Sequence, residues 1–444
     1  MKKSTLIVLV VAVALGAAVY YYDWKRGTPK EDAAEESKPA FHFTVPNVNG
    51  LDITHAGQKF VLEKQNDAWQ ITQPIATGAD GPTIDGIVTE IAGANVSRTI
   101  TPSADLSPYG LKQPALTASV RLKDGTQHSL QFGDKDFSGS AVYAIVDDAK
   151  QVSLIPAGII ETANKPLDDL RDRAVLHFNT DNVQAVDVKK PSGEVVLAKQ
   201  GSNWVLQKPR ETPASRSAVT ALLEGISLGK FTTVASETPT PPELARYGLA
   251  NPAVTVTLTL KDGKQATLQV GKKEGQEYDA RDPSRPMVFH VGDTIYKKLD
   301  EGLADLRDKK IYAFDADALS SIEIHNHTTN ETMVCSKGTD KTWRIDQPAN
   351  VKGKTADIYK ISAPLDSAEA SEVIDSPSAD IRARLAKPAL EITFTETSGK
   401  KTTLRFSVET EGYVYAESTA GTAVYKITKQ TLDDLSFKSD ALGS

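Results

Sequence analysis

Apolar and polar residues alternate strictly over three short stretches of the chain. In each stretch the even-numbered positions are apolar and the residues between them are mostly threonine or other polar residues. The stretches are 116–122, 254–260 and 390–394. Such alternation buries one face of a strand and leaves the other in water, which is typical of an antiparallel sheet. Each stretch is followed by a signal for a tight hairpin turn. These signals are Asp124-Gly125, Asp262-Gly263 and the weaker Ser398-Gly399.

A longer apolar spacing lies upstream of each strand. Three apolar residues stand 15, 18 and 22 positions after a tryptophan, and offsets of three and seven place them on one face of a helix. The three sets are Ile84, Ile87 and Ile91; Val219, Leu222 and Ile226; and Ile358, Ile361 and Leu365. Each set therefore predicts one amphipathic helix that turns this face to a core.

The tryptophans themselves stand in a repeated motif, Trp-x-aliphatic-x-x-Pro. It occurs at Trp69, Trp204 and Trp343, which are 135 and 139 residues apart. Apart from Trp24 near the N-terminus, each repeat holds one tryptophan. Self-similarity at a fixed period is the sequence signature of a repeated structural unit. We therefore expect three tandem copies of one module, with the tryptophans as equivalent core residues.

A turn with the pattern Tyr-Gly-Leu-x-x-Pro follows each helix. It begins at Tyr109 and Tyr247, and the third copy keeps only the leucine and proline, with Arg384 in place of the glycine. Glycine adopts backbone conformations that other residues resist, so Arg384 predicts a different turn in the third copy. The two tyrosines suit stacking on a sugar or peptide as well as packing on their own module, and we favour packing.

Each module is expected to close with a Leu-x-Asp-Leu segment, at 167–170, 303–306 and 432–435. Arg171-Asp172 and Arg307-Asp308 follow the first two copies, and Ser436-Phe437 follows the third. We interpret the Arg-Asp pairs as part of a capped joint between modules in preference to a recognition feature.

The predicted fold class is α+β. Three tandem modules, 43–176, 177–313 and a degenerate 314–444, each hold an antiparallel sheet with one or two helices. The order and spacing of these motifs resemble the uncharacterised bacterial family known as domain of unknown function 4340. That resemblance implies one N-terminal membrane span and a large external part. It also implies an accessory role in the envelope, in some members beside ABC export systems of the gliding-motility type. It supplies no catalytic residue.

The N-terminus carries an uncharged apolar run at residues 5–22, after Lys2 and Lys3. Eighteen residues of helix span about 27 Å, close to the thickness of the bilayer's hydrocarbon core. Tyrosines and Trp24 follow at the interface, so residues 1–26 predict a transmembrane anchor and 27–42 a polar linker. The lysines favour a cytoplasmic N-terminus with the modules in the periplasm of a bacterium, in a single pass through the inner membrane. A signal peptide cleaved after Ala14 or Ala18 is the alternative.

Composition narrows the class of partner. Lys+Arg 51 against Asp+Glu 58 gives a net charge of −7 without a basic run, so we expect no nucleic-acid partner. The lone cysteine, Cys335, excludes an internal disulfide framework and a cysteine-based zinc cluster. No cysteine lies near the apolar segment, which excludes a lipoprotein anchor.

The sequence holds no phosphate loop, no nucleophile elbow and no paired-cysteine motif, and we expect no cofactor. Glu323, His325 and His327 are weak candidates for a metal site, because alternate residues of a strand share a face. Solvent exposure is the favoured interpretation, since Ile322 and Ile324 would take the buried face.

Repetition favours a function without catalysis, because the triplicated residues are apolar or turn-forming. We expect a membrane-anchored accessory or scaffold protein of an envelope complex, with transporter subunits as candidate partners, and no enzyme. The alternative is a module that binds peptidoglycan or another envelope polymer through repeated weak sites.

Overall fold

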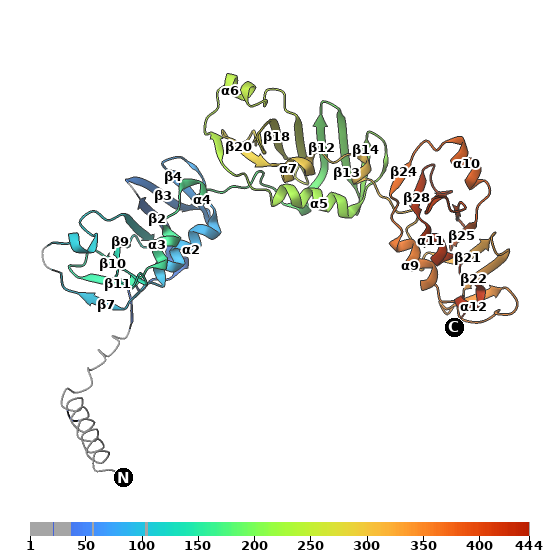
Figure 1. Cartoon of the computed structure of the whole chain (residues 1–444), viewed down its shortest axis with the longest axis horizontal. Coiled ribbons are helices and arrows are strands. Elements are labelled where there is room, and N and C mark those ends of the chain that lie inside the picture. Colours follow the sequence, from blue (N-terminus) through green and yellow to red (C-terminus); the bar gives the residue numbers. More distant parts are fainter. Residues whose placement is uncertain (1–20, 22–36, 56, 103–104, 444) are drawn as a thin grey trace, which may run out of the picture. The chain divides into compact units, whose positions relative to one another are not determined.

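The computed structural model of the chain describes Tyr21 and residues 37–55, 57–102 and 105–443. The chain divides into two compact units, 1–173 and 174–444. Within the described residues, three large antiparallel sheets follow one another, one in the first unit and two in the second (Figure 1). The helices share hydrophobic cores with the strands of their own sheet. The chain is therefore α+β, as predicted.

The first sheet has the strand order β5-β4-β3-β2-β8-β9-β10-β11-β7. Its strands are β2 (Val48–His55), β3 (Gln58–Gln65), β4 (Ala68–Gln73), β5 (Thr77–Gly78), β7 (Arg98–Ile100), β8 (Leu116–Leu122), β9 (Gln127–Lys135), β10 (Ala141–Val146) and β11 (Val152–Pro156). A separate pair joins β1 (Lys38–Pro39) to β6 (Asn95–Val96). The helices are η1 (Val45–Asn47), α2 (Gly81–Ala92), η2 (Ser107–Tyr109), α3 (Gly158–Ala163) and α4 (Leu167–Leu170).

The second sheet repeats this topology, in the order β15-β14-β13-β12-β17-β18-β19-β20-β16. Its strands are β12 (Val183–Lys190), β13 (Gly193–Gln200), β14 (Asn203–Lys208), β15 (Thr212–Pro213), β16 (Val234–Ser236), β17 (Val254–Leu260), β18 (Gln265–Glu274), β19 (Glu277–Arg281) and β20 (Val288–Gly292). The helices are η3 (Thr180–Asn182), α5 (Arg216–Ser227), α6 (Pro241–Arg246), α7 (Asp293–Leu299) and α8 (Leu303–Leu306).

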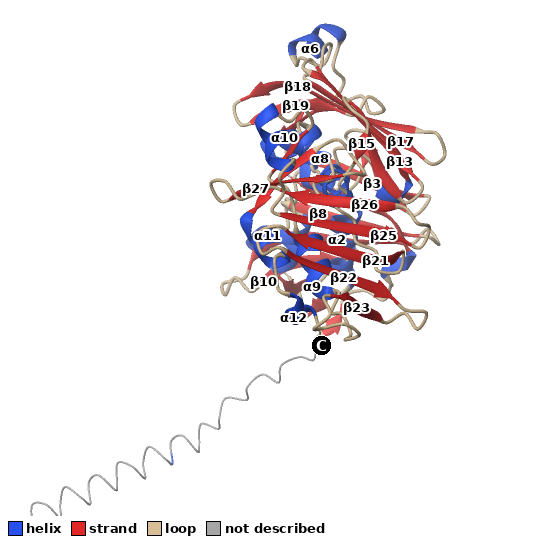
Figure 2. Ribbon diagram, turned by 90° about the vertical axis from the view of Figure 1, so that its right-hand side faces the viewer, coloured by secondary structure: helices blue, strands red, loops and turns tan. Residues whose placement is uncertain are grey.

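The third sheet has the order β23-β22-β21-β25-β26-β27-β28-β24, and Figure 2 shows β22, β21, β25 and β26 side by side. Its strands are β21 (Leu319–Asn326), β22 (Glu331–Lys337), β23 (Trp343–Gln347), β24 (Glu372–Ile374), β25 (Leu390–Glu396), β26 (Lys401–Phe406), β27 (Tyr413–Ser418) and β28 (Val424–Thr428). The helices are α9 (Tyr359–Ser367), α10 (Ala379–Leu385), α11 (Lys429–Leu435) and α12 (Ser439–Leu442).

The alternating stretches form β8, β17 and β25, each central in its sheet. Their predicted apolar faces are buried, apart from Leu260, which is half-buried at the end of β17. The predicted helix faces are also buried in α2 and α5. In the third module Ile361 and Leu365 lie on the buried face of α9, while Ile358 is the residue before the helix and is half-buried against the same core. Asp357, which accepts a hydrogen bond from the backbone N–H of Tyr359, precedes the start of this helix.

The three tryptophans occupy one equivalent buried position. Trp69, Trp204 and Trp343 are 3%, 7% and 8% exposed, on β4, β14 and β23. The strand paired with each of them contains a register shift at the matching place. The proline that ends each motif follows a cis peptide bond in all three copies. The predicted equivalence of the tryptophans as core residues is confirmed.

The Tyr-Gly-Leu turn depends on two glycines. Gly110 and Gly248 have φ of 70° and 72°, in the left-handed region. The carbonyl oxygen of the tyrosine before each lies against a glycine of the neighbouring strand, Gly133 or Gly271. In the third module Arg384 lies inside helix α10, so the predicted difference in this turn is confirmed.

Both tyrosines of this turn contact their own module. Tyr109 packs edge-on against Tyr143, with ring centroids 5.1 Å apart, beside a small cluster of buried residues around Leu111. The hydroxyl of Tyr247 donates to the backbone carbonyl of Ala235 at 3.4 Å. The packing interpretation accounts for both rings.

The closing segments correct one assignment. Arg171 pairs with Ala79 through an isolated bridge and Arg307 pairs with Ala214, and in the third module Gly443 pairs with Ala356 in the same way. The segment before Gly443 is α12, whereas residues 432–435 belong to α11, the counterpart of α7. The prediction that 432–435 are the third copy is therefore wrong, because a four-residue motif recurs by chance inside α11.

Within the described residues, no helix is both long enough and apolar enough to cross a membrane. The predicted anchor at residues 5–22 falls, apart from Tyr21, outside the part of the chain that the structure describes.

Candidate functional site

The three weak metal candidates lie on the open face of the third sheet, on β21 and just after it. Ile322 and Ile324 fill the core between them, as expected. His325 Nε2 lies 2.8 Å from a carboxylate oxygen of Glu323, but His327 Nε2 lies 3.2 Å from Glu391, on the neighbouring strand. Among the described residues no group of three or more His, Cys, Asp or Glu side chains is placed to hold a metal ion.

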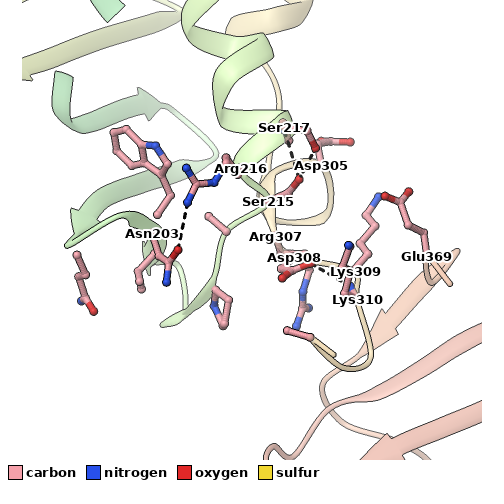
Figure 3. Close-up of a pocket in the computed structure, with 17 residues that line it drawn as sticks. Asn203, Ser215, Arg216, Ser217, Asp305, Arg307, Asp308, Lys309, Lys310 and Glu369 are labelled. Carbon is pink, nitrogen blue, oxygen red and sulfur yellow. Dashed lines mark hydrogen bonds between the residues drawn. The ribbon is translucent and has the colours of Figure 1, made fainter. Parts of the chain in front are cut away.

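A cavity of about 1030 Å³ lies in the second unit, at the N-terminus of α5. We name it the α5 pocket and define it by Trp204, Ser215, Arg216, Lys309, Lys310 and Glu369, which line it (Figure 3). These residues are spread over more than 160 positions of the chain, and the fold brings them together.

Helix α5 begins at this pocket because Ser215 caps it. The Ser215 hydroxyl accepts a hydrogen bond from the backbone N–H of Ala218 at 3.3 Å, which satisfies one of the free donors of the first turn. Arg216 extends from the same turn and donates to the backbone carbonyl of Ser202 at 2.8 Å and to Asn203 at 3.3 Å. The capped helix start and Arg216 give this wall of the pocket a positive electrostatic character.

One of the lining residues, Arg307, belongs to a largely buried ion pair. Arg307 is 5% exposed, and its two terminal nitrogens donate to the carboxylate of Asp375 at 3.0 and 3.1 Å. Arg210 reaches the same carboxylate at 3.2 Å. The Arg307 guanidinium lowers the pKa of Asp375 below its ordinary value. We call Arg210, Arg307 and Asp375 the arginine joint. The two arginines precede β21, the first strand of the third sheet along the chain, and Asp375 follows it.

The opposite wall combines Lys309 and Lys310 with Glu369. The backbone N–H of Ala370 donates to the carbonyl of Lys309 at 3.1 Å, and Lys310 forms an isolated bridge with Glu369. The pocket therefore presents Arg216, Lys309 and Lys310 together with the carboxylates of Asp305, Asp308 and Glu369, beside an indole ring. A lining of mixed charge suits a polar ligand that carries both charges.

A polar cluster that the sequence did not reveal lies in the second sheet. Asp279 is 1% exposed, and burial raises its pKa above the ordinary value. His290 Nε2 lies 3.3 Å from its carboxylate, while His290 Nδ1 lies 2.9 Å from the hydroxyl of Thr233. Asp279 and His290 face each other across paired strands, and only the register brings them together.

This cluster is specific to one module. The pair that corresponds to Asp279 and His290 is Tyr143 with Leu154 in the first sheet, and Tyr415 with Lys426 in the third. Neither pair holds a carboxylate or an imidazole. A catalytic chain built on these positions would therefore belong to the second module alone.

Comparison with known families decides the relationship. The family described as Domain of unknown function (DUF4340) matches residues 69–203 and 204–384, two adjacent segments that together span more than half of the chain. The chain belongs to this family. Within DUF4340, the two matched segments establish a tandem arrangement, as the repeated motifs predicted. The segments begin at Trp69 on β4 and Trp204 on β14, so their boundaries fall inside the first and second folded modules and not between them.

No curated protein sequence matches the chain. Among solved structures, a putative DNA polymerase III beta subunit from Eubacterium rectale is similar at 6% identity, over 87% of this chain and 92% of its own, with a TM-score of 0.16. A DNA polymerase III beta sliding clamp from Bartonella birtlesii has 9% identity, the same coverage and a TM-score of 0.14. Likeness at such TM-scores supports no statement about fold or function.

Proposed function

We propose that this DUF4340 protein is a membrane-anchored, non-catalytic accessory or scaffold of a bacterial envelope complex, auxiliary to an ABC-type exporter or a similar assembly. Residues 5–22 would anchor it in the inner membrane, with the modules in the periplasm. The observation that carries the proposal is which residues recur. The buried tryptophan, the central strand and the hairpin are common to the three sheets.

Ionisable clusters, by contrast, differ between the modules. Asp279 with His290 belongs to the second sheet and Glu323 with His325 to the third. A repeated active site would place titratable groups at equivalent positions, because catalysis needs them within hydrogen-bond reach of each other. One carboxylate recurs, as Asp52, Asp187 and Glu323, but its basic partner changes from Arg121 to Lys189 to His325. A framework that repeats without a constant acid–base pair supports a role in holding partners.

The open faces of the sheets supply the surface for such contacts. In the second sheet Thr257 faces Thr267 across paired strands, with hydroxyls 3.5 Å apart, and in the third Thr393 faces Thr403 at 2.9 Å. The first sheet places Ser119 opposite Ser129. Small hydroxyl side chains leave a sheet face flat, and they lose little entropy when a partner covers them.

The test is affinity purification of the tagged full-length chain from gently solubilised membranes. We expect envelope proteins to co-purify, and a variant that lacks residues 314–444 should retain few or none of them. Replacing Glu323, His325 and His327 together by alanine is the matched control, and it should leave co-purification intact and bound metal at background. Loss of cellular function in the triple variant, with folding unchanged, would bring a metal or enzyme function forward.

The α5 pocket favours one second candidate, the binding of an envelope polymer such as peptidoglycan. Trp204 offers a ring edge, and Lys309 and Lys310 offer cations for its carboxylates. Sedimentation with purified peptidoglycan tests this candidate. Pelleting of the full chain that is lost in K309E/K310E, but kept in the surface control K360E, would favour the polymer over the scaffold.

A further inference from the structure

The most exposed large apolar side chain of the described residues is Phe137, at 102% of its reference exposure. It stands at the tip of the hairpin between β9 and β10. Burying a phenylalanine from water contributes about 1.5–3 kcal/mol, so leaving it fully exposed forgoes that stabilisation. The corresponding hairpin of the second sheet carries Gly275 and the polar Gln276.

The hairpin holds Phe137 outward in a fixed turn. The Asp136 carboxylate accepts hydrogen bonds from the Ser138 hydroxyl at 2.7 Å and from the backbone N–H of Ala141 at 3.0 Å. The backbone N–H of Gly139 donates to the carbonyl of Asp136 at 3.0 Å. Since both sides of the turn are tied to Asp136, Phe137 is presented by an ordered loop and cannot fold back without breaking these bonds.

The strand register places this hairpin beside the point where the chain enters the first module. Lys38 pairs with Val96 in the β1–β6 pair, and β6 lies beside β11. Pro156, at the end of β11, pairs with Ala141 at the start of β10. Neighbouring strands are about 4.8 Å apart, so Lys38 lies within about 15 Å of the base of the hairpin. We call this end of the first sheet the tether end.

The tether end is the part of the module nearest to the apolar segment in the sequence. Fifteen residues, 23–37, separate residue 22 from Lys38, and covalent geometry limits their reach to about 50 Å. A short tether gives the tip a high effective concentration at the membrane surface. Lys38 is exposed, and Lys135 at the base of the hairpin lies 3.4 Å from Glu161. Asp134 and Asp136 stand in the same hairpin, so the charges near the tip are mixed, and the exposed ring with its short tether carries the argument.

We propose that Phe137 inserts into the interfacial region of the lipid bilayer and docks the first module on the membrane. The inference rests on the proposed anchorage and adds a second contact, with the surface of a phospholipid bilayer as its partner. A lone aromatic ring on a rigid turn suits this partner. A protein interface needs a broad complementary patch around its anchor residue, whereas a bilayer accepts a single ring at headgroup depth.

The native chain simplifies the test. Its one cysteine, Cys335, is buried, and burial raises the pKa of its thiol to about 12, so it reacts slowly with thiol reagents at neutral pH. A fluorophore that responds to polarity can therefore be attached at F137C in the full-length chain, reconstituted in vesicles of phosphatidylethanolamine and phosphatidylglycerol. We expect a blue shift of its emission, and quenching by phospholipids with brominated chains.

Labels at two control positions test whether the response depends on the place of Phe137 at the tether end. K123C lies at the opposite end of β9, and V408C lies in the corresponding hairpin of the third sheet, where Val408 is also exposed. Labels at both should keep the emission they show in solution. A blue shift at V408C equal to that at F137C would show that any apolar tip binds lipid, and would overturn the role of the tether end.

The outcomes separate the two proposals. Carbonate washing reports the anchor, since an integral chain stays with the vesicles. A retained chain with an unshifted label at F137C overturns the docking and leaves the anchor standing. A chain that washes off with an unshifted label overturns both. A shift that needs native membrane proteins and is absent with pure lipid overturns the lipid assignment in favour of a protein partner.

Discussion

At the scale of single residues, replacing either of two glycines by alanine should change the stability of the first module, in opposite directions. A Cβ atom at Gly133 would stand 2.0 Å from the carbonyl oxygen of Tyr109. At Gly86, an exposed position within α2, it would meet nothing within 4 Å. We expect Gly133→Ala to destabilise the first module by at least about 2 kcal/mol through overpacking. Gly86→Ala should stabilise it by about 0.5–1 kcal/mol, because alanine favours a helix. Amide hydrogen exchange in the first sheet measures both.

Two substitutions of Trp69 should separate the stability that its packing contributes from the stability that its hydrogen bond contributes. The indole N–H of Trp69 donates to Asp85 at 2.8 Å. Trp69→Ala should cost about 3–5 kcal/mol, whereas Trp69→Phe should lose about 1 kcal/mol for the hydrogen bond and some packing besides. Chemical unfolding followed by hydrogen exchange within the first module reports the difference. Leu228→Ala, at an exposed position, should change stability by less than about 0.5 kcal/mol. An unchanged first module in Trp69→Ala would contradict the core assignment.

At the scale of elements, the arginine joint predicts a response to acid. Asp375 has its pKa lowered chiefly by hydrogen bonding to Arg307, so its contribution to stability is present above its unfolded pKa and is lost as the pH falls through the folded one. The joint should therefore hold at neutral pH and weaken only below about pH 4. Arg307→Ala should loosen it at every pH, at a cost on the order of 3 kcal/mol, because a buried pair loses one partner.

Limited proteolysis at residues 308–313 measures the loosening, with the appearance of two fragments as the readout. Arg344→Ala is the control, since Arg344 pairs with Asp340 at an exposed site and such pairs contribute about 0–1 kcal/mol. Equal proteolysis of Arg307→Ala and Arg344→Ala would show that the joint does not hold the segment.

The elements also show which features a sequence reveals. Alternation and helical spacing are local, so the central strands, the helices α2 and α5 and the tryptophan positions were predictable. The third closing segment was not, because its place is set by the pairing of Ala356 with Gly443, far apart in the chain. Asp279 and His290 meet only through strand register, and the α5 pocket gathers residues from Trp204 to Glu369. Neither the spacing of residues along the chain nor the composition predicts that these side chains lie close together.

At the scale of the whole molecule, the proposed anchorage predicts where the two ends of the chain lie. Lys2 and Lys3 before the apolar run favour a cytoplasmic N-terminus. A reporter active only in the periplasm, fused after Ser444, should therefore give signal. The purified protein should begin at or near Met1. An N-terminus that starts after Ala14 or Ala18 would show a cleaved signal peptide and remove the anchor.

The DUF4340 segments do not begin and end where the folded modules do, and this offset matters when a fragment of the chain is to be expressed. The first segment starts at Trp69 and ends at residue 203, so it leaves out β2 and β3 and takes β12 and β13 from the next sheet. In the folded order β2 lies between β3 and β8, at the middle of the sheet. The sequence repeat is thus a circular permutation of the folding unit. A fragment cut at the sequence boundaries would carry a first sheet without β2 and β3 together with two strands of the second sheet, whereas one cut at 41 and 173 would keep the first sheet whole.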